Sequence, residues 1–497
     1  MASNDTRLLS RRQILRYGLT GAALTTLAAC QPKVVMQTVV VEKEVEKVVQ
    51  QTVVVEKEVE KKVEVTKEVI KIATAAPSEV IEIRFQDGIQ PADEGNALKL
   101  FEQFHEKNPK IKIKNEPNPD GWPDKTLTMM AAGTAPDIHL GYGDPMYLFV
   151  SRGMFMDLQP KIDSDLKAEQ VDDYVKAQYD FFQFGKPGKR FALPKYCGTS
   201  AYLYNKGMFE EAGLPLPDNT WDWLTTLEVA QKLTKLDDKG KPLTFGLDIA
   251  DLHHLGYVLA CFIWTWGGEV HKPGDNSVCM MDGTEALEAL QFAQDLRFKY
   301  KVNGMPSDYD AMKTIGWGLI GTGKVAMHRG GSWHIPMALQ SCDFAFDCME
   351  NPLAPGGKHR ETFLTTDGYG IWVGTKHPDE AWQVLKFLSV SGEWNKHLIT
   401  SSWPLQPAKR SLVKDWIDHL KKNNARIANA DIEAFTRSFE YARPQVSFCD
   451  NPAALEIINP VLDEIYKLGK VQAKEAIPPL VKQVNELLKS KCPDGGW

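Results

Sequence analysis

The runs VIEIRF at residues 80–85, IKI at 111–113 and APDIHL at 135–140 each predict a short β-strand. Between them, residues 97–107 and 126–132 carry apolar side chains at helical spacing. An order of strand, helix, strand, helix and strand predicts a mostly parallel sheet covered by helices. The chain is therefore expected to fold as an α/β protein.

The loops that follow these strands are the expected place for a ligand. Open α/β sheets bind ligands beyond the carboxyl ends of their strands. Asp87 follows the first predicted strand, and the loop GYGD at residues 141–144 follows the third. Both are expected at the same edge of the sheet.

Composition and charge exclude several classes of protein. The 497 residues are 43% hydrophobic and 25% charged, which is ordinary for globular domains. No run of eighteen apolar residues predicts a membrane-spanning helix. The formal charge is -7 overall, and about -10 falls on the 420 residues after residue 77. Such acidity argues against binding to nucleic acid and against adhesion to anionic lipid.

The first thirty residues resemble a bacterial lipoprotein signal of the twin-arginine type. SRRQILR at residues 10–16 carries the paired arginines, an apolar stretch covers 18–29, and Cys30 follows Leu27-Ala28-Ala29. The resemblance implies that residues 1–29 are removed and that Cys30 is lipidated, which tethers the exported protein to the membrane. The alternative is an N-terminal helix with a chance cysteine.

Residues 30–77 are expected to form a stalk. QTVVVEKEVE occurs at residues 37–46 and again at 51–60, a period of two heptads with Val at most core positions. A helical stalk fits this pattern, and a solvated charged tether is the alternative because Val is a poor helix former. In either form the segment spaces the body from the membrane.

The seven cysteines after Cys30 leave disulfide pairing open. Cys342–Cys348 is the most plausible local pair and Cys261–Cys279 is a second candidate, while buried free thiols are equally compatible with the sequence. No CxxC motif or His/Cys cluster has zinc-ligand spacing, so no metal or other cofactor is expected.

Motifs in the middle of the chain carry a family resemblance. They are RFALP at 190–194, YLYNK at 202–206, FEEAGL at 209–214, WGG at 266–268, GKVAM at 323–327, GSW at 331–333 and DGYGI at 367–371. In number and order these motifs resemble the extracellular solute-binding proteins of ABC importers, the large family that includes maltose- and oligosaccharide-binding proteins. The resemblance covers about residues 80–410.

This resemblance implies a periplasmic-binding-protein-like fold of type II, with two α/β lobes joined by crossing segments that act as a hinge. Lobe one is expected to combine residues 78–196 and 370–403, and lobe two residues 197–369 and 404–497. The implied function is capture of a solute, most plausibly a carbohydrate, and its delivery to the transmembrane subunits of an ABC permease. No enzymatic activity is implied.

A sugar offers an apolar C–H face to aromatic rings and hydroxyl groups to carboxylates and amides. The expected ligand-binding residues are Asp87, Trp122, Asp144, Tyr257, Trp266, Trp333, Tyr369 and Trp403. Each has a structural alternative, such as a core position for Trp266 and Trp333 or a helix N-cap for Asp144. Tyr196 and Gly198 are weaker candidates. Arg329 is expected to reach an anionic ligand or to form a surface ion pair.

Three further functions remain open from the sequence. The segment YCGTS at 196–200 carries no carboxylate where some family members have Glu, which leaves the identity of the sugar open. A binder of a non-sugar solute, such as a polyamine, an organic anion or a phosphodiester, is one alternative, and a sensor partner that presents its ligand to a receptor is another. An exported glycosidase would need two carboxylates in one cleft, for which Asp87 and Asp144 are candidates. No hydrolase, metalloprotease or phosphate-binding loop motif supports catalysis.

Overall fold

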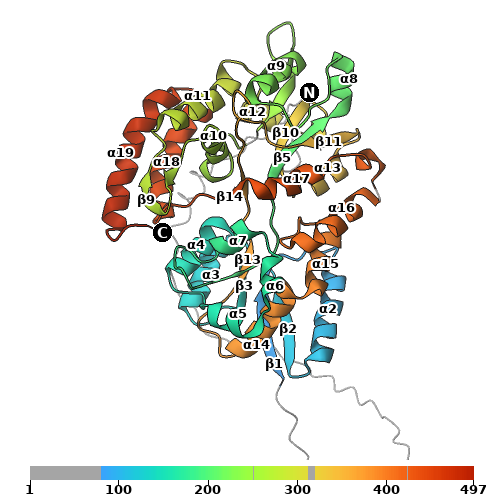
Figure 1. The fold of residues 1–497 in the computed structure, drawn as a ribbon, viewed down its shortest axis with the longest axis vertical. Coiled ribbons are helices and arrows are strands. Elements are labelled where there is room, and N and C mark those ends of the chain that lie inside the picture. Colours follow the sequence, from blue (N-terminus) through green and yellow to red (C-terminus); the bar gives the residue numbers. More distant parts are fainter. Residues whose placement is uncertain (1–79, 250, 312–319, 423, 497) are drawn as a thin grey trace, which may run out of the picture. The chain divides into compact units, whose positions relative to one another are not determined.

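The computed structural model describes residues 80–249, 251–311, 320–422 and 424–496. The predicted signal, Cys30 and the stalk lie outside the described residues. Two five-stranded sheets organise the rest of the chain, each covered by helices (Figure 1). None of the helices in the described ranges is both long and apolar enough to cross a bilayer.

The first sheet has the strand order β2-β1-β3-β13-β4. Its strands are β1 Ile81–Gln86, β2 Ile111–Glu116, β3 Ile138–Gly141, β4 Leu193–Pro194 and β13 Gly368–Ile371. β1 runs parallel to β2 and β3, and β13 is antiparallel to its neighbours. Ile83 and Phe85 are buried on β1, which explains the alternating apolar pattern of this strand. The parallel βαβαβ order expected from the sequence is confirmed.

Helices from two separate parts of the described chain, residues 94–181 and 378–400, surround the first sheet. They are α2 Glu94–Lys107, α3 Trp122–Ala131, α4 Gly143–Ser151, α5 Gln159–Asp165, α6 Ala168–Asp172, α7 Lys176–Phe181, α14 Pro378–Leu385, which continues as the π-helix η3 Lys386–Val390, and α15 Gly392–Thr400. α3 begins at Trp122, four residues before the helical pattern of residues 126–132, because Pro123 suits the first turn of a helix.

The second sheet has the strand order β11-β5-β10-β7-β6. Its strands are β5 Ser200–Asn205, β6 Lys235–Leu236, β7 Pro242–Asp248, β10 Val325–Gly331 and β11 Phe346–Met349. All six residues of β5 are buried, since separate hydrophobic clusters pack against the two faces of this strand. β10 runs antiparallel to β5 and parallel to β7.

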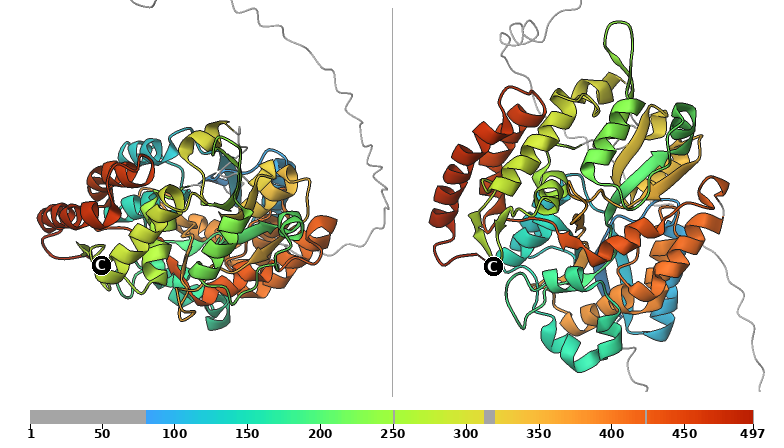
Figure 2. Two further views of the ribbon diagram at one scale, coloured as in Figure 1. Left: turned by 90° about the horizontal axis from the view of Figure 1, so that it is seen from above. Right: turned by 45° about the horizontal axis from the view of Figure 1, so that its top comes forward.

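The other strands, α-helices and π-helix lie between the strands of the second sheet in the sequence or follow them. They are α8 Lys206–Ala212, α9 Trp223–Leu233, the π-helix η1 Leu255–Leu259, α10 Ala260–Thr265, β8 His271–Lys272, β9 Asp275–Cys279, α11 Thr284–Phe298, α12 Pro306–Ala311, α13 His334–Ser341, β12 Thr362–Leu364, α16 Val413–Lys422, α17 Glu433–Arg437, β14 Ala442–Pro444, α18 Asn451–Tyr466 and α19 Ala473–Lys491. In Figures 1 and 2 the red helices α18 and α19 lie beside α11, and Ile458, Leu462 and Val484 are buried in the same cluster as α11.

Three segments link the elements of the first sheet to those of the second: residues 195–199, 365–367 and 401–410. They hydrogen-bond to one another. The amide of Lys195 donates to the carbonyl of Asp367 at 3.0 Å, and the amide of Cys197 donates to the carbonyl of Gln406 at 3.2 Å. The crossing segments therefore form one narrow connection between the two sheets.

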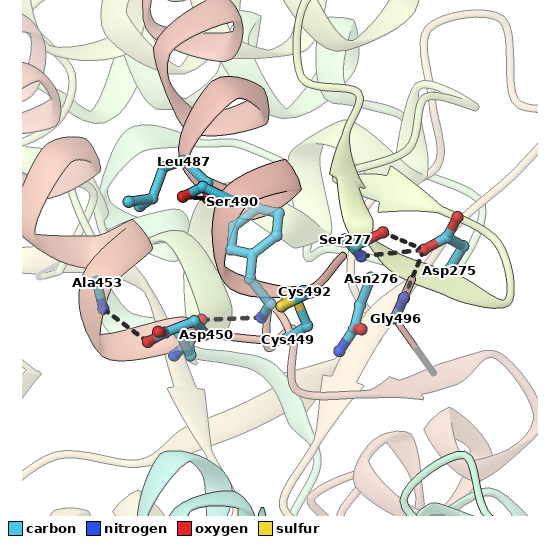
Figure 3. Close-up of a disulfide and its surroundings, with 12 residues drawn as sticks. Asp275, Asn276, Ser277, Cys449, Asp450, Ala453, Leu487, Ser490, Cys492 and Gly496 are labelled. Carbon is cyan, nitrogen blue, oxygen red and sulfur yellow. Dashed lines mark hydrogen bonds between the residues drawn. A yellow bond between two sulfur atoms is a disulfide. The ribbon is translucent and has the colours of Figure 1, made fainter. Parts of the chain in front are cut away.

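A disulfide joins Cys449 to Cys492 across the ends of the α18–α19 hairpin (Figure 3). The predicted pairs Cys342–Cys348 and Cys261–Cys279 were wrong, because all four residues are buried free thiols. Antiparallel packing of α18 and α19 brings the residue before one helix next to the residue after the other.

Candidate ligand-binding pocket

The described residues enclose a cavity of about 790 Å³, which falls in the usual range for small-molecule sites. Its walls come from the carboxyl ends of the strands in both sheets and from the crossing segments. The lining includes Asp87, Asp93, Asn118, Tyr142, Lys195, Tyr196, His254, Tyr257, Arg329, Trp333, His334, Phe363, Thr365, Asp367, His397 and Trp403. Four of the eight predicted ligand-binding residues are therefore brought together: Asp87, Tyr257, Trp333 and Trp403.

The other four predicted residues lie outside the lining. Trp122 packs against Tyr142, with ring centroids 5.7 Å apart, so it supports a lining residue from behind. The ring of Trp266 lies 5.1 Å from that of Phe292, against the hydrophobic core that packs on the second sheet. Trp266 therefore has the core position that was the alternative to a ligand contact. Tyr369 is fully buried and does not line the cavity.

Asp144 contacts another part of the chain instead. It lies in the first turn of α4 rather than at the N-cap, and Asn451 Nδ2 donates to its Oδ1 at 2.6 Å. Burial raises the pKa of Asp144 to about 6. The nearby Tyr147 hydroxyl donates to the carbonyl of Cys449. These bonds tie α4 to the segment that precedes α18.

Three aromatic rings form one wall of the pocket. The ring of Phe363 lies 5.1 Å from that of Tyr257 and 6.0 Å from that of Trp333. Trp333 packs closely over glycine: a Cβ at Gly331 would lie 2.3 Å from its ring, so a larger residue there would displace the indole. The Nε1 of Trp333 is buried and has no hydrogen-bond partner among the described residues, so the face of the indole is the part that lines the cavity.

A buried charged group lies where the first sheet meets the crossing segments. Lys195 Nζ lies 2.7 Å from Asp87 Oδ1, and the Tyr369 hydroxyl donates to Asp87 Oδ2 at 2.8 Å. Because both oxygens of Asp87 are engaged and the residue is only 1% exposed, its main contact is with the protein. The amide of Gly88 also donates to Asp87 at 2.7 Å, as expected for a turn.

Asp367 is a pocket carboxyl that the sequence analysis did not select. It is 6% exposed, and burial raises its pKa to about 7, although Lys195, Thr365 and Tyr196 act in the opposite direction. The crossing segment at residues 195–199 carries no carboxylate, and Asp367 supplies one from the crossing segment at residues 365–367. Its position directly before a Gly-Tyr-Gly strand was the only sequence signal.

The second sheet contributes a hydrogen-bonded chain that ends at the pocket. His328 Nδ1 lies 2.7 Å from Asp248 Oδ2, and its Nε2 lies 2.9 Å from Nδ1 of His334. Burial lowers the pKa of His334 to about 3, so this imidazole is neutral at physiological pH. The chain orients the ring of His334, which lines the cavity.

Arg329 also lines the cavity from β10. Within the described ranges it forms no ion pair with an acid, so the surface ion pair expected as one alternative is not seen there. Its Nη2 donates to the carbonyl of Tyr257 at 3.0 Å and lies 3.1 Å from Cys261 Sγ. Among the described residues, no group of three or more His, Cys, Asp or Glu side chains is arranged to hold a metal ion.

Comparisons with known proteins agree with this architecture. The family model described as bacterial extracellular solute-binding protein matches residues 90–392. A binding protein of Brucella abortus is 24% identical over 423 residues, which cover 84% of this chain and 96% of that protein. The galactooligosaccharide-binding protein of Bacillus subtilis is 23% identical over 80% of this chain and 86% of its own length.

The solved structures include an ABC substrate-binding protein of Listeria monocytogenes in complex with cycloalternan. It has a TM-score of 0.68 and 21% identity, and the match covers 83% of this chain and 99% of that chain. This similarity confirms the expected two-lobe α/β fold. The family match spans more than half of the sequence, so the chain belongs to the family of bacterial extracellular solute-binding proteins.

Proposed function

We propose that this chain is a lipid-anchored, extracytoplasmic binding protein that captures a sugar or oligosaccharide and delivers it to an ABC permease. The observation that carries the proposal is the wall of Tyr257, Trp333 and Phe363 in a cavity of about 790 Å³ that also holds carboxyl, amide and imidazole groups. Aromatic faces with polar side chains around them suit a pyranose ring. The relatives named for galactooligosaccharide and cycloalternan binding support the same ligand class.

Hinge closure around the ligand is the motion that this arrangement supports. We assign residues 78–196 and 370–403 to lobe one, and residues 197–369 and 404–497 to lobe two. Pocket residues come from both: Asn118 and Tyr142 from the first, Tyr257 and Trp333 from the second. Each lobe keeps its own sheet, so the three crossing segments are the proposed hinge. Opening would also break the hydrogen bonds from α4 to Cys449 and Asn451.

The proposed anchor is Cys30, at the end of the twin-arginine signal. Two acyl chains on this residue would be enough for stable attachment to the outer face of the cell membrane. The repeat at residues 37–60 would then hold the binding lobes away from the lipid surface.

A thermal-shift screen of the mature chain tests the proposal. The panel contains neutral oligosaccharides, acidic saccharides, polyamines, organic anions and glycerophosphodiesters. A saccharide is expected to raise the melting temperature in proportion to its occupancy of the folded state. Recovery of that saccharide intact after incubation is expected for a binding protein. Stabilisation by a non-saccharide alone would contradict the proposed ligand class, and hydrolysis of the bound saccharide would favour the glycosidase.

A further inference from the structure

Arg329 is a buried cation that faces the ligand cavity. It is 8% exposed, and its Nη2 lies within hydrogen-bonding distance of the carbonyl of Tyr257 and the thiol of Cys261. It makes no ion pair with any carboxylate in the part of the chain that the structure describes. Its Nε and Nη1 groups likewise have no hydrogen-bond partner there.

Most other partly buried arginines in the described ranges are paired with acids. Arg360 and Arg437 bind Glu350, and Arg443 binds Glu269 at 2.7 Å. Arg190 and Arg297 are buried and donate to backbone carbonyls, yet neither lines the cavity. Arg329 thus combines burial, absence of a carboxylate partner and access to the pocket. Burying a guanidinium in this way is costly unless an anion compensates its charge.

The acids of the pocket are engaged elsewhere. Asp87 is bound by Lys195, and Asp93 accepts hydrogen bonds from the amide and hydroxyl of Ser402 at 2.8 and 2.6 Å. Asp251 is exposed at the rim. Asp367 is buried on the crossing segment, where its nearest cation is that same lysine. Of the lysine and arginine side chains that line the cavity, Lys195 is thus bound by a carboxylate, whereas Arg329 is left to bind an anion.

The surroundings of Arg329 fit a sugar ring as well as an anion. The guanidinium carbon lies 5.5 Å from the ring centroid of Phe363, which also contacts the rings of Tyr257 and Trp333. A pyranose against these rings would place a ring substituent within reach of the free guanidinium donors. Guanidinium binds carboxylate and phosphate oxygens through two parallel hydrogen bonds.

From this geometry we propose that the ligand is an acidic saccharide whose carboxylate or phosphate group is bound by Arg329. The inference rests on the proposed function and refines its ligand class. A uronic acid residue and a sugar phosphate would present the same oxyanion chemistry to this site.

Isothermal titration with matched ligands tests the inference. One pair consists of oligouronides of two or three residues and the same oligomers after reduction of their carboxyl groups to neutral hexoses. The other pair consists of sugar phosphates and the corresponding free sugars. At least one acidic ligand is expected to bind roughly 10- to 100-fold more tightly than its neutral counterpart, the usual range for a charge-assisted hydrogen-bonded pair.

Variants of Arg329 test whether this side chain causes the preference for the acidic ligand. Arg329→Gln is expected to bring the ratio of the affinities for the acidic ligand and its neutral counterpart close to one, and this ratio is the readout whatever the variant does to the affinity for the neutral ligand. Arg329→Lys keeps the positive charge but loses the two parallel hydrogen-bond donors of the guanidinium. It should therefore retain part of the preference for the acidic ligand. Arg152→Gln, at an exposed position at the end of α4, is the matched control and should bind as the wild type does.

The outcomes separate this inference from the proposed function. Equal binding of acidic and neutral saccharides, failure of every acidic saccharide to bind, or an unchanged preference in Arg329→Gln would overturn the inference alone. Binding of only non-saccharide solutes would overturn the proposed function as well. If Arg329→Gln fails to fold, the wild type decides: added salt must weaken binding of the acidic ligand and leave the neutral one unaffected.

Discussion

Replacing Trp333 by alanine removes the largest ring from the pocket wall and should weaken ligand binding strongly. The indole lines the cavity and packs against Phe363. Its Nε1 is buried, so the ring face is the part that a sugar can contact. The variant removes this face.

The expected magnitude follows from the area of this contact. A pyranose face that covers roughly 60–80 Å² of the indole removes apolar surface worth about 1.5–2 kcal/mol. This free energy corresponds to a loss of roughly 12- to 30-fold in Kd. Trp333→Phe keeps a smaller ring, so it should bind more weakly than the wild type and more tightly than Trp333→Ala.

Isothermal titration with the saccharide that stabilises the wild type most is the appropriate assay. Trp266→Ala is a matched control, because this indole packs against Phe262 and Phe292 and does not line the cavity. It should lower the melting temperature while Kd changes by less than twofold. A folded Trp333→Ala protein that binds like the wild type would refute the placement of the ligand against this wall.

Three more perturbations test other parts of the account. Burial raises the pKa of Asp367 to about 7, whereas in the unfolded state this carboxyl releases its proton near pH 4. The folded state therefore binds the proton more tightly. The stability that this carboxyl contributes is present at low pH and falls as the pH rises from about 4 to 7. Asp367→Asn should therefore gain stability relative to the wild type at pH 8 but not at pH 4, and equal differences at both pH values in thermal melts would contradict this assignment. The double substitution Cys449→Ser and Cys492→Ser removes a disulfide that links residues 43 positions apart. It should lower the free energy of unfolding by about 2–4 kcal/mol in chemical denaturation and leave Kd unchanged. A higher Kd would mean that the C-terminal hairpin shapes the pocket. Cys30→Ser should move the full-length protein from the membrane fraction to the soluble fraction, and continued membrane association would argue against the lipid anchor.

Local patterns were sufficient for the architecture. The strands at Ile81–Gln86, Ile111–Glu116 and Ile138–Gly141 alternate or concentrate buried apolar side chains, and the helices between them have a regular buried face. Such periodicity depends on neighbouring residues alone, so a single sequence reveals it. The family motifs then indicated the crossing segments that no local pattern defines.

The pocket was only partly predictable. Tyr257 and Trp333 were predicted because the family resemblance implies aromatic residues at these positions, and both side chains line the cavity. Asp367 and Arg329 were missed or undervalued, since their role depends on which charged groups lie near them in space. Arg329 became informative only when the structure placed it beside the cavity without an acidic partner.

The disulfide shows the same limit. Cys449 and Cys492 flank two helices of similar length, α18 and α19, whose antiparallel packing brings the two residues together. Short spacing along the chain favoured Cys342–Cys348 instead. Cys342 ends α13 and Cys348 lies within β11, and both thiols are buried in the hydrophobic core. Reading the C-terminal segment as a helical hairpin would have pointed to the observed pair.

The most direct test is a crystal structure of the mature chain with the saccharide that binds it most tightly. We expect the sugar ring to lie against Trp333 and Tyr257 inside the cavity, with an oxyanion of the ligand on the Arg329 guanidinium and residues of both lobes in contact with it. Electron density for the ligand at any other place, with this cavity filled only by solvent, would contradict the account.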